Sequence, residues 1–136
     1  MEANANASKA KILFESTKSF EKELKRLDNV DRKRVINKVN SCAQWLSKGS
    51  HIFNQNLYTL PLPFGINGYE LSLYILRVSS RLRIVLTLDE DPIFEQIIIT
   101  LFRVTSADNL EQEYCNIAKS LYQDFLCREH DPVGVM

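Results

Sequence analysis

Four arginines lie on segments whose composition is typical of β-strands. Arg77, Arg81 and Arg83 fall within YILRVSSRLRIVLTLDEDPIF (residues 74–94), before any acidic residue, and Arg103 ends the next apolar segment. The planar guanidinium group of arginine donates paired hydrogen bonds to phosphate oxygens. We therefore interpret the four side chains as a candidate phosphate-binding cluster. The alternative is that each one is solvated or paired with an acidic side chain.

Three apolar segments must position these arginines. Residues 69–78, 82–88 and 94–104 are rich in β-branched side chains and are joined by short connections, which predicts an antiparallel meander. In the middle segment, leucine and isoleucine alternate with Arg81 and Arg83. Because side chains alternate between the faces of a strand, we expect the leucine face in the core and both arginines on the other face.

The order of these strands predicts where the arginines meet. The middle strand of a meander runs opposite to its neighbours, so its beginning lies beside the ends of the other two. We therefore expect Arg77, Arg81, Arg83 and Arg103 to converge at one end of the sheet. The acidic turn DEDP (residues 89–92) falls at the opposite end. This placement predicts an arginine cluster without local carboxylates.

Two charged helices are predicted before the sheet. KILFES (residues 11–16) is a possible strand, and the apolar side chains of STKSFEKELKRLD (residues 16–28) recur at i, i+4 and i+7, which is a helical spacing. We expect the next helix, in residues 32–49, to begin after an N-cap at Asp31 and to end at Gly49. Helices joined by so short a turn predict an antiparallel hairpin.

A last helix is predicted after the sheet. Asp108 and Glu111 have the spacing of a capping box. Apolar side chains then share one helical face: Leu110, Tyr114, Ile117, Leu121 and Phe125. The expected fold class is therefore α+β, with an N-terminal helical hairpin packed on a small, mainly antiparallel β-sheet and a C-terminal helix.

Length and composition are those of a single globular domain. The chain has 136 residues, of which 45% are hydrophobic and 25% charged, and its formal net charge is zero. We expect one domain over residues 9–128, between a disordered tail at residues 1–8 and a C-terminal tail at residues 129–136. Residues 1–50 hold 11 of the 17 Lys and Arg but only 6 of the 17 Asp and Glu. A neutral chain of this kind can still present a local basic face.

The sequence predicts neither a membrane segment nor a metal or cofactor site. No apolar run approaches the length of a transmembrane helix, and the polar beginning of the chain is not a signal peptide. The two histidines are isolated, and an odd number of cysteines without C-x-x-C spacing fits reduced thiols. We therefore expect a soluble cytoplasmic protein.

These features together resemble the RelE/ParE superfamily of toxins from bacterial toxin–antitoxin modules. The family signature has a leucine–arginine pair on one strand, an aromatic–arginine pair beginning the next, an acidic turn, and an arginine ending the last strand. The matching positions here are Leu76–Arg77, Leu82–Arg83, Asp89–Asp91 and Arg103. The resemblance spans roughly residues 11–125.

The RelE branch of this superfamily implies a metal-independent endoribonuclease that cleaves mRNA on the ribosome. The resemblance implies that Arg83 and Arg103 hold the scissile phosphate and that Arg77 and Arg81 assist in binding RNA. Cleavage also needs a base for the 2′-hydroxyl and an acid for the leaving 5′-oxygen. Tyr114 corresponds most nearly to the family's C-terminal catalytic tyrosine or histidine, although its helical spacing favours packing in the core.

Two alternatives to the ribonuclease stay open. RelE-type enzymes carry lysines where this chain has Leu73 and Ile75, and a glycine where it has Ser80–Arg81. These differences and the neutral charge fit the ParE branch, which inhibits DNA gyrase, or a RelE-like interaction domain without catalysis. Each toxin branch implies a cognate antitoxin whose carboxylates would lie near the arginines. The second partner would be the ribosome with its mRNA, or DNA gyrase.

Overall fold

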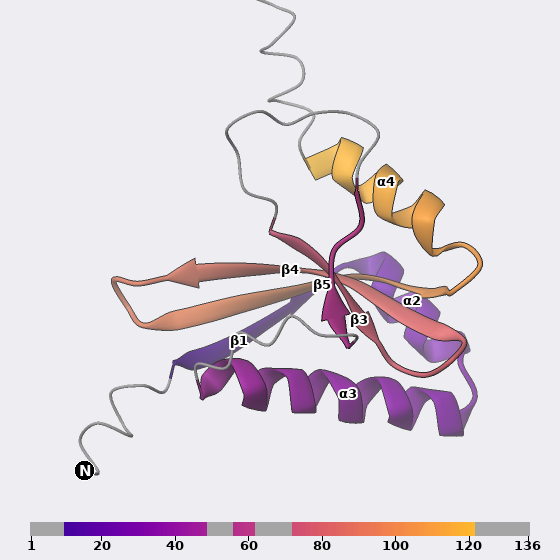
Figure 1. Ribbon diagram of the computed structural model, residues 1–136. Coiled ribbons are helices and arrows are strands. Elements are labelled where there is room, and N and C mark those ends of the chain that lie inside the picture. Colours follow the sequence, from indigo (N-terminus) through magenta and orange to yellow (C-terminus); the bar gives the residue numbers. More distant parts are fainter. Residues whose placement is uncertain (1–9, 49–55, 62–71, 122–136) are drawn as a thin grey trace, which may run out of the picture.

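The computed structural model describes residues 10–48, 56–61 and 72–121, and it has the α+β class that the sequence predicts (Figure 1). The elements in chain order are β1 (Lys11–Ser16), α2 (Lys18–Arg26), α3 (Asn29–Ser47), β2 (Leu57–Tyr58), β3 (Leu73–Arg77), β4 (Leu82–Asp91), β5 (Gln96–Ser106) and α4 (Leu110–Leu121). The strands form one sheet in the order β1-β5-β4-β3-β2. β1 runs parallel to β5 and the other pairs are antiparallel, which confirms the predicted meander.

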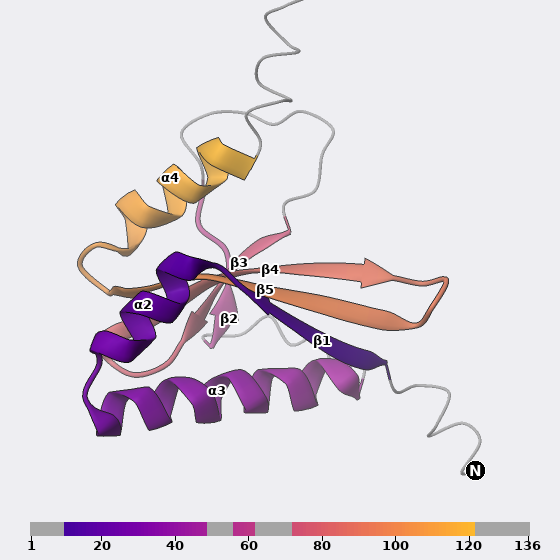
Figure 2. The same cartoon turned by 180° about the vertical axis from the view of Figure 1, so that it is seen from behind.

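Helices cover both faces of the sheet. α2 and α3 pack on one face, and α4 packs on the other (Figures 1 and 2). Beneath α3, Leu76, Ile84 and Leu86 belong to the larger hydrophobic core. Beneath α4, Ile75 and Val85 belong to a second core and are completely buried. From the sequence, only the leucine face of β4 is expected to lie in the core. Both faces are buried because α4 folds back over the sheet.

A β-bulge in β5 changes the face to which its last residues point. Val85 pairs with Arg103, but the next residue, Leu86, pairs with Leu101, so Phe102 is an extra residue in β5. In an unbroken strand, Leu101 and Arg103 would share a face. With the extra residue, Leu101 packs in the core beneath α2 and α3, while Arg103 lies on the face that carries Val85 and α4.

The helical hairpin forms as predicted, but its second helix begins earlier. The backbone N–H of Asp31 donates to Asp28 Oδ1 at 2.8 Å, so Asp28 is the N-cap of α3 and Asp31 lies in the first turn. The prediction of Asp31 as the cap was wrong because both aspartates suit that position, and the earlier one is used. The guanidinium of Arg32 then closes the hairpin by donating to three carbonyl oxygens, those of Leu24, Lys25 and Leu27.

β2 was not predicted from the sequence. Leu57 and Tyr58 pair with Leu76 and Ile75, and they lie outside the segments that were expected to form strands. Two residues are too few to show the alternation by which a strand is recognised.

Several sequence-based expectations fall outside the described residues. They are the tails at residues 1–8 and 129–136, the helix stop at Gly49, and the packing of Phe125. Among the helices that the structure describes, none is long and apolar enough to cross a membrane.

Thr17 joins α2 to β5. Its Oγ1 accepts a hydrogen bond from the backbone N–H of Phe20 at 3.1 Å, as the N-cap of α2, and donates one to the carbonyl oxygen of Phe102 at 2.8 Å. We expect Thr17→Val to lower the free energy of unfolding by about 2 kcal/mol, because the side-chain shape is kept while both bonds are lost. Urea unfolding followed by circular dichroism measures the change. Thr59→Val, at an exposed position, is the control, and an equal loss there would contradict this role of Thr17.

The carboxyl group of Asp89 makes the stability of the fold depend on pH. Partial burial raises the pKa of this carboxyl group, and the charge of Glu15 raises it further, while a hydrogen bond with Thr87 lowers it. A carboxyl group whose pKa is higher in the folded than in the unfolded protein destabilises the fold as the pH rises through that pKa. We expect Asp89→Asn to raise the melting temperature at neutral pH, and the gain to vanish below about pH 3, where the carboxyl is protonated in both states. Glu90→Gln on the same strand is the control, and a gain that persists in acid would contradict this explanation.

Candidate phosphate-binding site

Arg77 and Arg83 face each other across the hairpin of β3 and β4. The strand register pairs them directly, and Arg83 also pairs with Thr105 of β5. Residues that are directly opposed in antiparallel strands point to the same face, with their Cβ atoms about 5 Å apart. The predicted approach of these two arginines at one end of the sheet is therefore confirmed. They lie on the face that carries Val85 and α4.

The guanidinium group of Arg83 is oriented by neighbouring oxygens. Its Nε donates to the hydroxyl of Tyr58 at 3.2 Å. Its Nη1 donates to the carbonyl oxygens of Ser79 and Leu82. These acceptors are neutral, so the positive charge of Arg83 is held in place without being neutralised by them.

The guanidinium group of Arg103 is held by two carboxylates. Its Nε donates to Glu23 Oε2 at 2.7 Å, and its Nη1 and Nη2 donate to the two carboxylate oxygens of Glu113 at 3.1 and 3.4 Å. The hydrogen bond with Glu23 raises the pKa of Arg103, against an opposing effect of burial, and the charges of Glu23 and Glu113 raise it too. The expectation of a cluster without carboxylates was wrong for Arg103, because α2 and α4 bring acidic side chains to this end of the sheet.

The end of β1 explains why Glu23 reaches the sheet. β1 pairs with β5 only as far as Leu101, so the last part of β5 has no neighbouring strand on that side. α2 follows this free edge, and Glu23 Oε1 accepts the backbone N–H of Val104 at 2.9 Å. The same carboxylate therefore completes the hydrogen bonding of β5 and fixes the guanidinium of Arg103.

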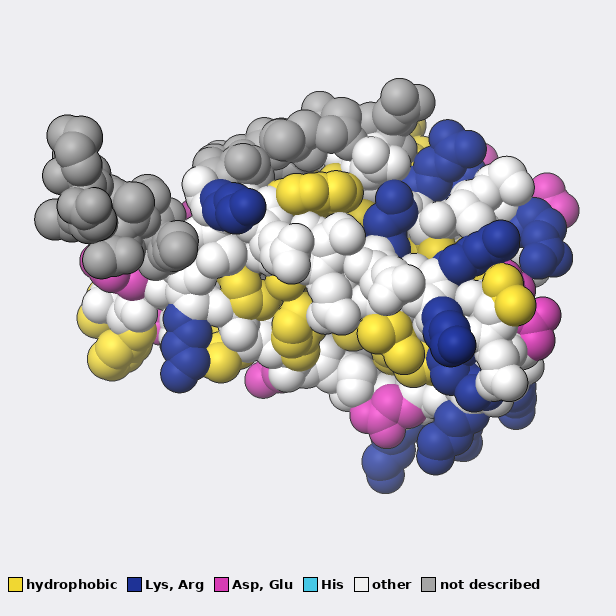
Figure 3. Space-filling view, turned by 90° about the horizontal axis from the view of Figure 1, so that it is seen from below, with side chains coloured by type: hydrophobic (Ala, Val, Ile, Leu, Met, Phe, Trp, Pro, Cys, Tyr) yellow, Lys and Arg dark blue, Asp and Glu magenta, His cyan; other side chains and the backbone are white. Residues whose placement is uncertain are grey.

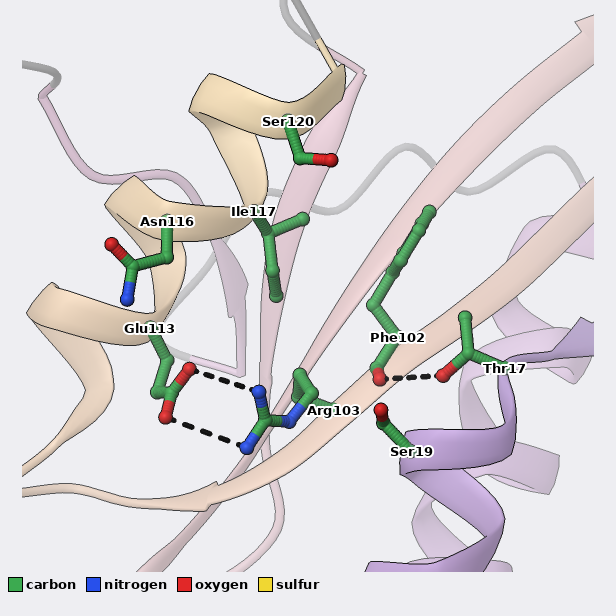
Figure 4. Close-up of a pocket in the computed structure, with 8 residues that line it drawn as sticks. All are labelled: Thr17, Ser19, Phe102, Arg103, Glu113, Asn116, Ile117 and Ser120. Atoms are coloured by element: carbon green, nitrogen blue, oxygen red, sulfur yellow. Dashed lines mark hydrogen bonds and ion pairs between the residues drawn. The ribbon is translucent and has the colours of Figure 1, made fainter.

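Arg103 opens into a pocket of about 290 Å³ between α2, β5 and α4 (Figure 4). Its lining is Thr17, Ser19, Phe102, Arg103, Glu113, Asn116, Ile117 and Ser120. The pocket thus combines one guanidinium group and one carboxylate with hydroxyl and amide groups. An oxyanion that entered it would find the donors of Arg103 occupied by Glu113, and would have to replace that carboxylate to be held by both guanidinium nitrogens.

Arg81 points to the other side of the sheet. Its Nη2 lies 3.3 Å from Asp31 Oδ2 on α3, and the side chain is 73% exposed. The expectation that Arg81 and Arg83 share a face was wrong, because Arg81 precedes the first residue of β4 and is not subject to the alternation of the strand. The four arginines lie near one end of the sheet, but Arg81 does not belong to the same surface as the other three.

Tyr114 lies in the second core. Its side chain is completely buried beneath α4, and its hydroxyl donates to the carbonyl oxygen of Leu73 at 2.9 Å. This position corresponds to the core packing that its helical spacing favours.

Three residues of the site were not predicted from the sequence, namely Tyr58, Glu23 and Glu113. Tyr58 belongs to the two-residue strand β2, which carries no recognisable pattern. Glu23 lies 80 residues from Arg103 in sequence, and on a highly charged helix it resembles any other solvated glutamate. Glu113, ten residues after Arg103, offered one signal, since a helix that packs back on the strand before it brings its first turn close to that strand.

Within the described ranges, no group of three or more His, Cys, Asp and Glu side chains is arranged to hold a metal ion. The pocket beside Arg103 is lined by guanidinium, carboxylate, hydroxyl and amide groups.

Comparison with known proteins finds similarity at the level of structure. No protein-family model matches the chain, and no curated protein matches it. The chain is similar to a RelB–RelE antitoxin–toxin complex from Methanococcus jannaschii, with 22% identity, a TM-score of 0.44, and coverage of 74% of this chain and 96% of that one. For the E. coli DinJ–YafQ toxin–antitoxin complex, the identity is 14%, the TM-score 0.44, and the coverage 71% and 93%. For the protein HP0894 from Helicobacter pylori the values are 17%, 0.36, and 74% and 98%.

The pairing of Arg103 with Glu113 can be measured by a double-mutant cycle. We expect Arg103→Met and Glu113→Gln to give a coupling energy of about 1 kcal/mol at low salt, because both side chains are partly withdrawn from water. Urea unfolding of the two single variants and the double variant supplies the cycle. Repeating it near 1 M salt should reduce the coupling, since the Debye length falls to about 3 Å.

The pair of Arg81 and Asp31 is the matched control for this cycle. Arg81 is far more exposed than Arg103, so its coupling to Asp31 should be smaller. Equal coupling energies for the two pairs would show that the partial burial of Arg103 does not strengthen its ion pair with Glu113.

Proposed function

We propose that this protein is the toxin of a toxin–antitoxin pair and acts in the cytoplasm as a ribosome-dependent mRNA endonuclease. The observation that carries the proposal is the placement of Arg77, Arg83 and Arg103 on one face at one end of the sheet. These positions match the arginines of the RelE/ParE signature. A phosphodiester is the ligand that three such side chains suit best, because each guanidinium presents a planar set of donors.

In this proposal, Arg83 and Arg103 hold the scissile phosphate and Arg77 binds the adjoining backbone. Arg83 is already oriented by Tyr58, while Arg103 must exchange the carboxylate of Glu113 for phosphate oxygens. The displaced carboxylate would then lie beside the bound phosphate. A carboxylate in that position can accept the proton of the 2′-hydroxyl.

The proposed reaction needs no nucleophile from the protein. The 2′-oxygen attacks phosphorus as its proton passes to Glu113. The bond from phosphorus to the 5′-oxygen breaks as that oxygen takes a proton from the hydroxyl of Tyr58, which leaves a 2′,3′-cyclic phosphate and a 5′-hydroxyl group. Both arginines stabilise the charge that develops on the phosphate. Tyr114 receives no catalytic role in this scheme, because its hydroxyl is in the core.

The proposed partners follow from the same site. The ribosome would present the mRNA, and a cognate antitoxin would block the arginines with carboxylates of its own. Arg103 already donates hydrogen bonds to two carboxylates from within the chain, which is the kind of contact that an acidic antitoxin segment would imitate.

One observation favours a second candidate function. The charge of Arg103 is balanced by Glu23 and Glu113, and a site neutralised in this way suits a protein that no longer cleaves RNA. The second candidate is therefore a ParE-like inhibitor of DNA gyrase, or a catalytically inactive RelE-like interaction domain.

Tightly controlled expression in a bacterium tests the ribonuclease. We expect growth arrest together with new 5′ ends inside the translated codons of a reporter mRNA. Arg83→Ala and Arg103→Ala should each reduce the cleavage by about 100-fold or more, because each removes a group that stabilises the transition state. Lys119→Ala, on the exposed side of α4, is the matched control and should cleave normally.

The other outcomes separate the candidate functions. Growth arrest with intact mRNA and a DNA-damage response would replace the ribonuclease by the gyrase inhibitor. A folded protein that causes no arrest would indicate the interaction domain. Normal cleavage by Arg83→Ala and Arg103→Ala would show that the reaction occurs elsewhere on the protein.

A further inference from the structure

The surface formed by α2 and α3 carries an uneven distribution of charge. Lys and Arg side chains are densest toward one end of this surface and are sparse toward the other end (Figure 3). The basic residues of α2 and α3 include Lys22, Lys25, Arg26, Lys33, Arg34 and Lys38. Although the chain is neutral, its described part therefore has a strongly basic region on the opposite side of the sheet from Arg83 and Arg103.

At this end, one carboxylate lies between two guanidinium groups. Asp31 Oδ2 is 3.3 Å from Arg81 Nη2, and Asp31 Oδ1 is 3.7 Å from Arg34 Nη1. The side chain of Asp31 is only 12% exposed, whereas those of Arg34 and Arg81 are 55% and 73% exposed. One negative charge cannot balance two positive ones. Asp31 thus holds both arginines near each other while leaving an excess positive charge that faces water.

A groove lies beside this pair of arginines. It has a volume of about 280 Å³, between α3 and the turn that joins β3 to β4. Its lining is Arg34, Asn37, Lys38, Ser41, Val78 and Ser79. The first four of these residues share one face of α3, because they are spaced by three or four positions. The groove therefore offers two cations together with amide and hydroxyl groups that can bind oxygen atoms.

We propose that this groove, with Arg81 at its edge, binds the phosphate backbone of RNA. Guanidinium and ammonium groups recognise phosphates without regard to base sequence, and the amide and hydroxyl groups suit ribose and phosphate oxygens. A protein partner fits less well, because protein interfaces are centred on buried apolar and aromatic anchors. Val78 is the apolar side chain in this lining. Binding of RNA at this groove would be a property separate from the proposed nuclease activity, since it requires no cleavage.

Fluorescence anisotropy with a short, labelled 2′-O-methyl RNA of mixed sequence tests this surface. This RNA lacks the free 2′-hydroxyl that cleavage would need, so the result does not depend on the proposed nuclease. The test variant is Arg34→Gln with Lys38→Gln, and Arg81→Gln is measured separately. The matched control is Lys11→Gln with Lys119→Gln, which removes two exposed positive charges away from the groove.

We expect the double variant in the groove to bind the RNA about tenfold more weakly at low salt, and Arg81→Gln about threefold more weakly. The slope of log K against log salt should become shallower by about 1.4 for the double variant, which corresponds to two phosphate contacts on a single strand. The control should keep the affinity and the slope of the unaltered protein.

Asp31→Asn gives a result that damage to the fold cannot imitate. This change keeps the size of the side chain and removes the negative charge between Arg34 and Arg81. We expect tighter binding of the RNA, because the arginines no longer share their charge with a carboxylate. Weaker or unchanged binding by a folded Asp31→Asn protein would contradict the role given to the groove.

Two further results would overturn the proposal. An equal loss of affinity in the groove variant and in the control would show that binding follows total charge alone. If RNA binding is unaffected while the same groove variant loses binding to a polyglutamate peptide, the surface recognises an acidic protein segment instead of RNA.

Discussion

The ion pairs of Arg103 connect three elements at one guanidinium group. Glu23 comes from α2, Glu113 from α4, and Arg103 itself from β5. The three side chains are only 20–32% exposed, so each charge depends on the others for compensation. A phosphate that binds Arg103 must therefore compete with contacts that hold the helices to the sheet. In the proposed function, the atoms that would bind phosphate are the same atoms that stabilise the fold, which is a common source of conflict between function and stability.

The fold was largely predictable because long elements have strong patterns. The alternation in β4 and the helical spacing in α2, α3 and α4 indicated the right elements in the right order. The positions of Arg77 and Arg83 at one end of the sheet followed from strand order alone. The bulge at Phe102 was not predictable, because one additional residue leaves an apolar segment unbroken. Unless this bulge is known, the face of the sheet to which Arg103 points cannot be derived from the sequence.

The division of the arginines between two surfaces shows the limit of alternation as a guide. Arg81 and Arg83 are two positions apart, yet Asp31 on α3 holds the first and Tyr58 on β2 orients the second. Alternation applies to Arg83 because it lies within β4, and it fails for Arg81 in the preceding turn. The partners of both residues come from distant parts of the chain. The same short sequence thus supplies positive charge to both sides of the molecule.

The parallel pairing of β1 with β5 has a consequence during synthesis. β1 begins at Lys11, but its partner begins at Gln96, so the ribosome must synthesise all the intervening residues before this pair can form. Until then, the free edge of β5 to which α2 is attached does not exist. Contacts between such distant segments also slow folding, because a long loop must close first. A nascent chain of this protein consequently cannot assemble the surroundings of Arg103 until α4, which supplies Glu113, has also been synthesised.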